Sequence, residues 1–479
     1  MEARHTRSAC PLSFSRRHFL ASAGAISASS QVGLFNFASS LFAAQGRSGP
    51  KPLVRAVFVR PDTDKYWLGW PGAAYDIKGH QRLYTKTLQE AAKKYDVDLV
   101  VIDAPLHDEG AVTKFLNSLR RIPPAGLIVV SMSLNQSWPH INRIAKQRGD
   151  IPTVVFSQMG TSFTAHLAGT RDIPGVYCAA TQDVGWLDFG MRMIRTVWDM
   201  KHTRICICAG SKTEDRPLNV IGTTLHYIPT SRFVEEFKKV EASEEVRAMA
   251  DYYANHAKKI VEPTKKDILD AAKNYVVCRR LMEAENCQGF SMDCLGPVGA
   301  HKIKPPCMAF SRLRDEGGLG TCEADWNAAI STRLTNLLFD RPGFMQDPAP
   351  NTVNNTLMAA HCCCATKLAG FDKDPAPFIL RTHSESNSGV GMQVLWEIGR
   401  PVTIMKFQGP ESIILGTGKI VANIDTPPSG GCRTSVELTV DGVADSRDTK
   451  GFHQLLIYDN LELPFKAYCQ LAGIKVVHV

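Results

Sequence analysis

The chain between residues 53 and 178 alternates between two hydrophobic patterns. Short uninterrupted apolar runs, rich in Val and Ile and bounded by Pro, Gly or Asp, occupy residues 53–59, 97–104, 126–133 and 151–157. Runs of this kind are typical of strands buried on both faces of a parallel sheet. Between them, residues 81–95 and 111–122 place Leu, Phe and Ala at helical spacing. The alternation predicts a first α/β domain over 53–178, built on an open parallel sheet with helices on both faces.

A second α/β pattern extends over residues 179–370. Residues 203–210 predict a strand that ends in a glycine turn, and residues 287–296 predict a strand that reaches a loop. Open α/β sheets bind ligands at the carboxyl ends of their strands. We therefore expect Asp293, Glu316 and Glu323 to lie at a ligand-binding edge of this second sheet.

After about residue 371 the helical spacing disappears. Residues 401–408, 412–423 and 433–443 are short apolar runs separated by Gly and Pro turns. This pattern predicts an antiparallel β-domain, a barrel or a sandwich, over residues 371–479, in which a strand carries His453 and a short helix closes the chain. The predicted fold is therefore two Rossmann-like parallel-sheet domains followed by a C-terminal antiparallel β-barrel-like domain.

Composition and charge narrow the class of protein. With 479 residues, 44% of them hydrophobic and 21% charged, the chain has the composition of a globular protein with more than one core. Of the formal net charge of +8, the four Arg and one Glu of residues 1–44 account for +3, which leaves about +5 for the rest. No basic stripe interleaved with aromatic residues is present, which argues against a nucleic-acid partner.

Residues 1–45 have the features of a targeting segment. Residues 15–20 read S-R-R-H-F-L, which resembles the twin-arginine signal S-R-R-x-F-L, and a weakly apolar run rich in Ala, Ser and Gly follows to residue 44. We expect export of the folded protein to the periplasm. The alternatives are a disordered N-terminus with a chance arginine pair, or a retained leader that acts as an anchor. No later segment has 18 uninterrupted apolar residues, so we expect no further transmembrane span.

The cysteines predict packing rather than crosslinks. Of 14 cysteines one lies in the leader, which leaves 13, and most of these sit in apolar segments where a thiol serves as a small buried hydrophobe. No two C-x-x-C motifs are present, so a structural zinc site has no support. Three consecutive thiols on one strand or helix cannot all face one ion, so we expect Cys362–Cys364 to pack beside His361.

Residues 306–365 contain the candidate chemistry. Glu323, Asp347 and His361 lie at predicted strand ends or loops beside apolar runs, and two carboxylates with an imidazole suit a hard divalent cation such as Mn²⁺ or Mg²⁺. Each residue also has a structural interpretation. Glu323 can favour the dipole of the helix that follows it, Asp347 can start a turn before Pro348, and His361 can be a core histidine.

Six segments in the second half of the chain, taken in order, resemble a known superfamily. They are KKDILDAAKNYVVCRRL, CQGFSMDC, PPCMAFSRLRDEGGLGTCEADW, FMQDPAPN, MAAHCCC and GFHQLLIYDN. The chain from about residue 240 onward is similar to the L-fucose isomerase and L-arabinose isomerase superfamily of metal-dependent aldose–ketose isomerases. The resemblance implies that Glu323, Asp347, His361 and His453 are metal ligands, and that the protein forms a homo-oligomer, a trimer or hexamer.

The resemblance also implies a reaction on a small carbohydrate. Bound Mn²⁺ would chelate an open-chain sugar and stabilise its ene-diolate, while Glu323 and Asp347 act as an acid/base pair. The residues proposed to contact the sugar are Arg312, Glu316, Gln346 and His383; ordinary ion pairs or a solvated turn are the alternatives for all of these except Gln346.

Two positions depart from the family pattern. Gln346 stands where arabinose isomerases have the glutamate of F-M-E-D, and Gln454 stands in the place of the second histidine of a G-x-H-H-like strand. These departures keep a second hypothesis open, namely a non-catalytic exported carbohydrate-binding protein that retains the isomerase fold.

Overall fold

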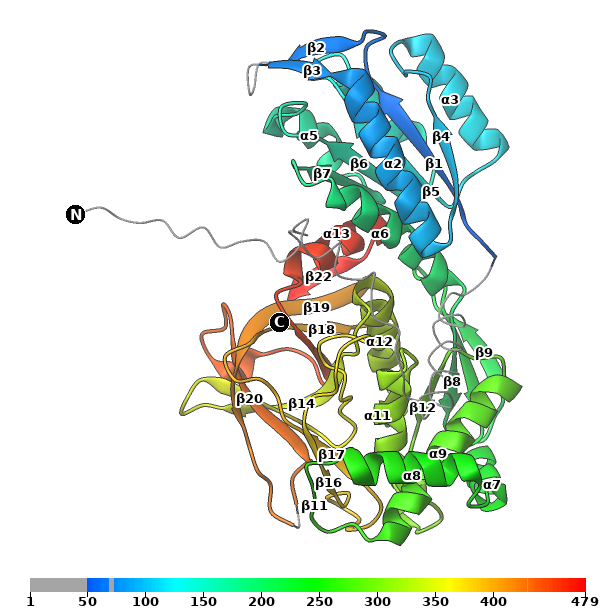
Figure 1. Ribbon diagram of the computed structural model, residues 1–479, viewed down its shortest axis with the longest axis vertical. Helices are drawn as coiled ribbons and strands as arrows, with labels where there is room; N and C mark the ends of the chain where they lie inside the picture. The colour runs from blue at the N-terminus through cyan, green and yellow to red at the C-terminus, as the bar shows by residue number, and fades with distance from the viewer. Residues whose placement is uncertain (1–49, 69–72, 429) are drawn as a thin grey trace, which may run out of the picture. The chain divides into compact units, whose positions relative to one another are not determined.

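A computed structural model describes residues 50–68, 73–428 and 430–479 of the chain (Figure 1). The predicted leader, residues 1–45, lies outside the described residues. No helix within the described ranges has both the length and the apolar composition needed to cross a bilayer.

The described residues form two compact units, and the first comprises residues 50–198 together with 466–473. It is built on a parallel sheet of five strands in the order β4-β1-β5-β6-β7. The strands are β1 (Leu53–Val59), β4 (Asp98–Ile102), β5 (Gly126–Ser131), β6 (Thr153–Ser157) and β7 (Val176–Ala180). A hairpin of β2 (Lys65–Leu68) and β3 (Ala73–Asp76) precedes the first helix. The sequence-based prediction of an open parallel sheet is confirmed.

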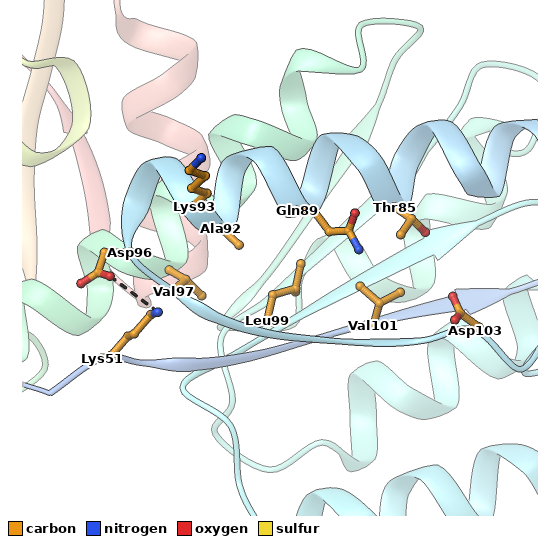
Figure 2. Close-up of a pocket in the computed structure, with 10 residues that line it drawn as sticks. All are labelled: Lys51, Thr85, Gln89, Ala92, Lys93, Asp96, Val97, Leu99, Val101 and Asp103. Atoms are coloured by element: carbon orange, nitrogen blue, oxygen red, sulfur yellow. Dashed lines mark ion pairs between the residues drawn. The ribbon is translucent and has the colours of Figure 1, made fainter.

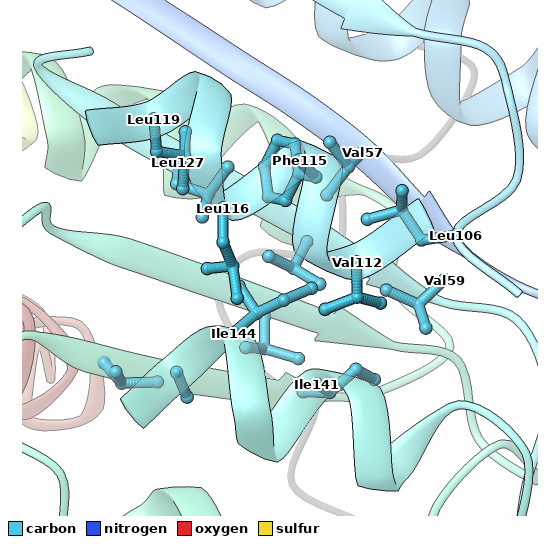
Figure 3. Close-up of a cluster of buried hydrophobic side chains, with 14 of the residues drawn as sticks. Val57, Val59, Leu106, Val112, Phe115, Leu116, Leu119, Leu127, Ile141 and Ile144 are labelled. Carbon is cyan, nitrogen blue, oxygen red and sulfur yellow. The ribbon is translucent and has the colours of Figure 1, made fainter. Parts of the chain in front are cut away.

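Helices accompany these strands. They are α2 (Ile77–Tyr95), α3 (Glu109–Arg121), α4 (Trp138–Gln147), α5 (Thr164–Arg171) and α6 (Gly185–Lys201). All except α5, whose only buried residue is Thr170, bury apolar side chains. Asp108 caps α3 by accepting the backbone N–H of Ala111 at 2.7 Å, which satisfies one of the unpaired donors of the first turn. Val112, Phe115 and Leu116 of α3 then pack with strand residues in a buried cluster (Figure 3).

The second unit comprises residues 199–465 and 474–479. Its α/β part has a sheet in the order β13-β12-β8-β10-β9, parallel throughout except for the antiparallel pair of β9 and β10. The strands are β8 (Arg204–Cys208), β9 (Glu214–Pro217), β10 (Thr224–Ile228), β12 (Gly289–Met292) and β13 (Gly320–Cys322). The helices are α7 (Thr230–Lys239), α8 (Glu244–His256), α9 (Lys265–Ala284), α10 (Leu295–Gly299), α11 (Cys307–Asp315) and α12 (Trp326–Phe339).

The rest of the second unit contains a closed antiparallel barrel. Six strands follow one another in the order β18-β21-β14-β15-β20-β19, and pairing of β19 with β18 closes the ring. They are β14 (Phe344–Asn351), β15 (Thr356–His361), β18 (Pro401–Phe407), β19 (Ser412–Asn423), β20 (Thr434–Val440) and β21 (Gln454–Tyr458). This region also has a short 3₁₀ helix, η1 (Ser446–Asp448), and a last strand, β22 (Lys475–His478), which pairs with β19. The helix α13 (Glu462–Ala472) lies between β21 and β22 in the chain, and most of its residues belong to the first unit. The predicted fold class, α/β followed by a barrel-like β-domain, is confirmed.

The barrel contains more of the chain than the hydrophobic pattern indicated. We expected the β-domain to begin near residue 371, yet β14 and β15 are two of its strands. The prolines of β14 conceal the strand in the sequence. Pro348 and Pro350 are tolerated because this half of β14 pairs with β15 on one side only. The strand β21, on the other side, pairs with the residues before it, Phe344 to Gln346.

Three short strands of the second unit form a separate small sheet. It consists of β11 (Lys259–Ile260), β16 (Phe378–Arg381) and β17 (Gly391–Val394), with β16 in the centre. The helix α13 does not end the chain as predicted, because β22 follows it.

Candidate metal centre

Four residues that were predicted as ligands come together in the second unit. Glu323 follows the carboxyl end of β13, Asp347 lies in β14, His361 ends β15 and His453 precedes β21. The Nε2 atom of His453 is 3.4 Å from Oε2 of Glu323 and 3.2 Å from Oδ1 of Asp347. The Nε2 atom of His361 is 3.9 Å from Oε1 of Glu323. The cluster therefore joins the last strand of the α/β sheet to three strands of the barrel.

The backbone at two of these positions is left-handed. Glu323 has φ of 59° and the next residue, Ala324, has φ of 55°, while His453 has φ of 53°. For residues with a side chain this conformation costs about 1–2 kcal/mol each. Strain of this kind is commonly retained at functional sites, where the surrounding structure fixes it. The cost is offset locally because the N–H of Ala324 donates to the carbonyl of Met292 at 2.9 Å.

Strand register decides which residue of Gln346-Asp347 faces the cluster. Neighbouring residues of a strand point to opposite faces of the sheet, and Asp347 is the one that reaches His453. Gln346 is paired instead with Gln454 on β21, and its Nε2 donates to Oε1 of Gln454 at 2.9 Å. The two departures from the family pattern are thus a single buried amide–amide contact.

A further carboxylate, that of Asp325, orients His453. Oδ2 of Asp325 is 2.9 Å from Nδ1 of His453 and 2.6 Å from Nζ of Lys406 on β18. A donor bond from Nδ1–H to this carboxylate leaves the Nε2 lone pair facing Glu323 and Asp347, the arrangement that metal-ligating histidines usually have. Asp325 also caps α12 by accepting the N–H of Ala328 at 2.9 Å.

Asp325 and Lys406 were missed by the sequence analysis. An aspartate before a helix indicates a cap, and that role hid its second one. A lysine within an apolar strand was the only signal for Lys406, whose side chain is 9% exposed, because lysine is rarely buried without a partner.

The charges of the cluster shift its pKa values in different directions. The neighbouring imidazole of His453, 3.4 Å away, outweighs burial and lowers the pKa of Glu323. Burial raises the pKa of Asp347, against the nearby histidines. Burial also raises the pKa of Asp325, but His453 and Lys406 outweigh it and lower that pKa to about 2. Environments that separate the pKa values of two carboxylates favour an acid and a base role for the pair.

Both histidines are held more basic than usual by the surrounding negative charge. Burial opposes protonation of His361, yet Cys363, Asp347 and Cys362 raise its pKa to about 10. Burial likewise opposes protonation of His453, and Asp325 and Glu323 raise its pKa. The cluster therefore attracts positive charge, as protons or as a cation, and cation binding is expected to release protons.

The fit of a cation rests on buried atoms without partners. Within the described residues, Oδ1 of Asp347, Nε2 of His361 and Nε2 of His453 are buried and have no hydrogen-bond partner. Ligand atoms of Glu323, His361 and His453 all lie within 4.8 Å of one another. Buried polar atoms are normally bonded, so three such atoms beside a carboxylate fit a shared cation. The donor set, oxygens and imidazole nitrogens, suits Mn²⁺ or Mg²⁺.

The residues predicted to contact sugar are placed differently. Arg312 and Glu316 form a buried ion pair, with 2.6 Å between Nε and Oε1, and the hydroxyl of Tyr275 donates to Glu316 at 2.7 Å. Glu316 caps the end of α11 and so precedes β13, whereas Glu323 follows this strand. The expectation that Glu316 lies at the ligand-binding edge was wrong, because Glu316 precedes the amino end of β13 and not its carboxyl end.

His383 lies in the loop after β16, next to Ser384, which contacts Cys362. Its Nδ1 is 3.1 Å from the hydroxyl of Ser386, and the neighbouring Ser384 places its hydroxyl 3.8 Å from the thiol of Cys362. The thirteen cysteines of the described residues are all unpaired, and all but Cys178 and Cys432 are buried.

A separate hollow occupies the surface of the first unit (Figure 2). It has a volume of about 580 Å³ and is lined by α2, β4 and residues next to them. Its carboxylates are Asp96, paired with Lys51 at 3.6 Å, and Asp103. The hollow therefore has no convergent set of ligands or acid and base groups comparable to the cluster in the second unit.

No protein-family model matches the chain, and no curated protein matches its sequence.

Proposed function

We propose that the protein is a metal-dependent aldose–ketose isomerase that acts on an open-chain sugar. Glu323, Asp347, His361 and His453 would hold a hard divalent cation, Mn²⁺ or Mg²⁺. The observation that carries the proposal is a set of three buried ligand atoms without partners: the Nε2 atoms of His361 and His453, which lie near Glu323, and Oδ1 of Asp347, which lies near His453. When bound, the cation would supply Lewis-acid stabilisation of the charge that develops on neighbouring sugar oxygens.

The two carboxylates divide the proton transfers. Glu323, whose pKa is lowered chiefly by the neighbouring imidazole of His453, is ionised and accepts the proton from C2 of the aldose. The protonated carboxylate exchanges its proton with solvent and then delivers a proton to C1, so that the sugar is isomerised without net gain or loss of atoms. Asp347, whose pKa burial raises, carries the proton that moves between the two sugar oxygens. This division follows the general rule that an acid and a base are distinguished by their surroundings.

The remaining residues hold these groups in place. Asp325 and Lys406 fix the ring of His453. One carboxylate oxygen of Asp325 contacts both Nδ1 of His453 and the ammonium group of Lys406. The barrel strands fix Asp347 and His361 by their pairing, in which Asp347 is opposite Ala360. Positioning of this kind is a large part of catalysis because a small displacement of reacting groups is costly.

The proposal extends to the cellular setting. The S-R-R-H-F-L segment supports export by the twin-arginine route to the periplasm, with the cation acquired before export. The family resemblance supports a homo-trimer or homo-hexamer.

Isotope exchange tests the reaction. The purified full chain is assayed for bound metal by mass spectrometry and then incubated with Mn²⁺ and a panel of aldopentoses and deoxyhexoses in D₂O. We expect a near-stoichiometric metal content after Mn²⁺ loading, ketose formation, and deuterium at carbon in the recovered sugar. Glu323→Gln should abolish the exchange, while Glu397→Gln, an exposed carboxylate of an ion pair, should not. Absence of both metal and exchange would contradict the proposal.

A second function is favoured by one specific observation. Gln346 and Gln454 bond to each other in the positions where family members have a carboxylate and an imidazole, which fits an exported carbohydrate-binding protein without catalysis. Saturable sugar binding by calorimetry, with no deuterium exchange in the presence of Mn²⁺, would support this second function instead.

A further inference from the structure

The other side of the His361 ring faces sulfur instead of oxygen. Its Nδ1 is 3.4 Å from Sγ of Cys363. One ligand atom each from Cys322, His361 and Cys363 lies within 4.8 Å of the other two, and all three residues are buried. Cys322 ends β13, next to Glu323, and Cys363 follows β15 by two residues. The same two chain segments thus carry a hard and a soft set of ligands.

The spacing of these atoms matches a tetrahedral thiophilic ion. Zinc lies about 2.3 Å from thiolate sulfur and about 2.0 Å from imidazole nitrogen, so tetrahedral ligands are separated by about 3.5–3.8 Å. The 3.4 Å between Nδ1 and Cys363 Sγ already agrees with this separation. The upper bound of 4.8 Å for the set needs only sub-ångström to ångström movements of side chains.

Nδ1 of His361 is a hydrogen-bond acceptor. The backbone N–H of Cys362 donates to it at 3.0 Å, so an ion bound at Nδ1 would replace this hydrogen bond. A neutral imidazole offers a lone pair at only one of its two nitrogens. His361 can therefore serve the oxygen-rich cluster through Nε2 or the sulfur-rich pocket through Nδ1, and in its neutral form it cannot serve both.

The positive charge of a buried arginine side chain favours an anionic sulfur in this pocket. Arg314 is fully buried, and its guanidinium donates to the carbonyl of Gly320 at 2.6 Å and to Sγ of Cys363 at 3.4 Å. No carboxylate of the described residues forms an ion pair with it. Since buried charges are normally paired, the sulfur of Cys363 is the anion that the surroundings of Arg314 provide.

We propose that Cys322, Cys363 and Nδ1 of His361 form a second metal site, which takes a thiophilic ion of the Zn²⁺ or Cd²⁺ class. Two sulfurs and one nitrogen are a donor set that selects such ions over Mn²⁺ or Mg²⁺. The thiols of Cys294 and Cys307 contact that of Cys322 and offer further ligands. The site does not depend on the isomerase proposal, and because His361 is shared, we expect the two kinds of ion to compete.

Cadmium is the probe of the sulfur site, since thiolate-bound Cd²⁺ has an ultraviolet sulfur-to-metal charge-transfer band. The full chain is treated with a chelator, titrated with Cd²⁺ and followed by absorbance. We expect a band that saturates at one ion per chain. Cys322→Ser and Cys363→Ser should each remove most of it. Cys364→Ser is the matched control, because Cys364 is equally buried and its thiol contacts the carbonyl of Ala365; its band should be unchanged.

The oxygen-rich cluster is measured separately by the electron paramagnetic resonance of Mn²⁺. Asp347→Asn should weaken Mn²⁺ binding and leave the cadmium band intact, and the double variant Cys322→Ser/Cys363→Ser should do the reverse. Failure of the isomerase proposal would therefore leave the cadmium result unaffected. Circular dichroism confirms folding, and zinc content after expression with added Zn²⁺ covers ions that enter only during folding. Absence of the band and of zinc in the wild type, or a band unchanged in both single cysteine variants, would overturn the proposal.

Discussion

At the scale of single residues, Asp325 carries the largest number of roles. It caps α12, bonds Nδ1 of His453 and pairs with Lys406. These three contacts depend on different properties of the side chain. The cap needs only an oxygen, which asparagine also offers, whereas the contacts with His453 and Lys406 depend on the negative charge.

Asp325→Asn separates these properties. We expect the helix cap to survive and the affinity for Mn²⁺ to fall about 10–100-fold, the usual effect of losing the outer partner of a ligating histidine. Isothermal titration calorimetry measures the affinity. The matched control is Asp108→Asn, another N-cap whose side chain accepts a backbone N–H, and it should leave Mn²⁺ binding unchanged. An unchanged affinity in Asp325→Asn would show that His453 is not oriented by this carboxylate.

The Gln346–Gln454 contact gives a prediction about stability instead of metal affinity. Gln346→Glu introduces the residue that arabinose isomerases have in the similar motif, but it removes the donor that bonds Gln454 and places a charge at a fully buried position. Gln454 cannot easily turn its amide, because its Nε2 donates to the carbonyl of Lys450. We expect Gln346→Glu to lower the free energy of unfolding by about 1–3 kcal/mol, measured by urea denaturation. Gln346→Met, which buries no charge, should cost less; a stabilising glutamate would contradict this account.

At the scale of elements, much of the chain could be predicted from its hydrophobic pattern. Uninterrupted Val and Ile runs indicated β1, β5 and β6 because a buried parallel strand has no polar face to interrupt it. β14 was not recognised, since Pro348 and Pro350 resemble a loop. Glu323 and His361 were visible as candidates because they stand in recognisable segments.

Other parts of the site could not be predicted because they depend on barrel closure. Asp325 and His453 are 128 positions apart in the sequence. The pairing of β21 with β14 and β18 places His453, and contacts of α12 with the barrel, such as the N–H of Phe407 to the hydroxyl of Ser331 at 2.8 Å, place Asp325 beside it. The cysteines illustrate the same limit. Cys322 and Cys363 have no ligand-like spacing, so a search for C-x-x-C pairs could not find them.

An ion pair anchors the small sheet of β11, β16 and β17. Arg381 on β16 contacts Glu262, which follows β11, with 2.7 Å between Nη2 and Oε1 and 2.9 Å from Nε to each carboxylate oxygen. The two side chains are 7% and 20% exposed. Burial disfavours the charged carboxylate, but these bonds and that from the N–H of Thr382 outweigh it and lower the pKa of Glu262.

The direction of this shift sets the pH dependence. A carboxylate whose pKa is lower in the folded state stabilises the fold above its ordinary pKa of 4.5, and the contribution is lost as the pH falls below that value. Glu262→Gln should therefore lower the free energy of unfolding by about 2–3 kcal/mol at neutral pH, and the difference from wild type should narrow in acid. Urea denaturation at several pH values measures it. Glu397→Gln, in an exposed pair with Arg400, should change stability little; a difference for Glu262→Gln that is independent of pH would contradict the assignment.

At the scale of the whole molecule, the candidate metal chemistry is confined to one compact unit. All four proposed ligands of the oxygen-rich cluster and all three of the sulfur-rich pocket belong to the second unit, residues 199–465 with 474–479. The ligands come from both the α/β sheet and the barrel of that unit. If the proposed ligands hold a cation, it would crosslink β13 to β14, β15 and β21, and its binding energy would add to the stability of these elements only in the folded state.

Hydrogen exchange can locate this stabilisation along the chain. At a Mn²⁺ concentration 100 times the dissociation constant, linkage predicts about 2.7 kcal/mol of added stability for the state that binds. We expect slower amide exchange, measured by mass spectrometry, in peptides that cover residues 320–325, 344–361 and 453–458, and no change within residues 50–198. Asp347→Asn should abolish the effect at the same Mn²⁺ concentration. Protection that appeared mainly in residues 50–198, or equally in the variant, would place the cation elsewhere, because an ion can protect only the elements whose ligands it joins.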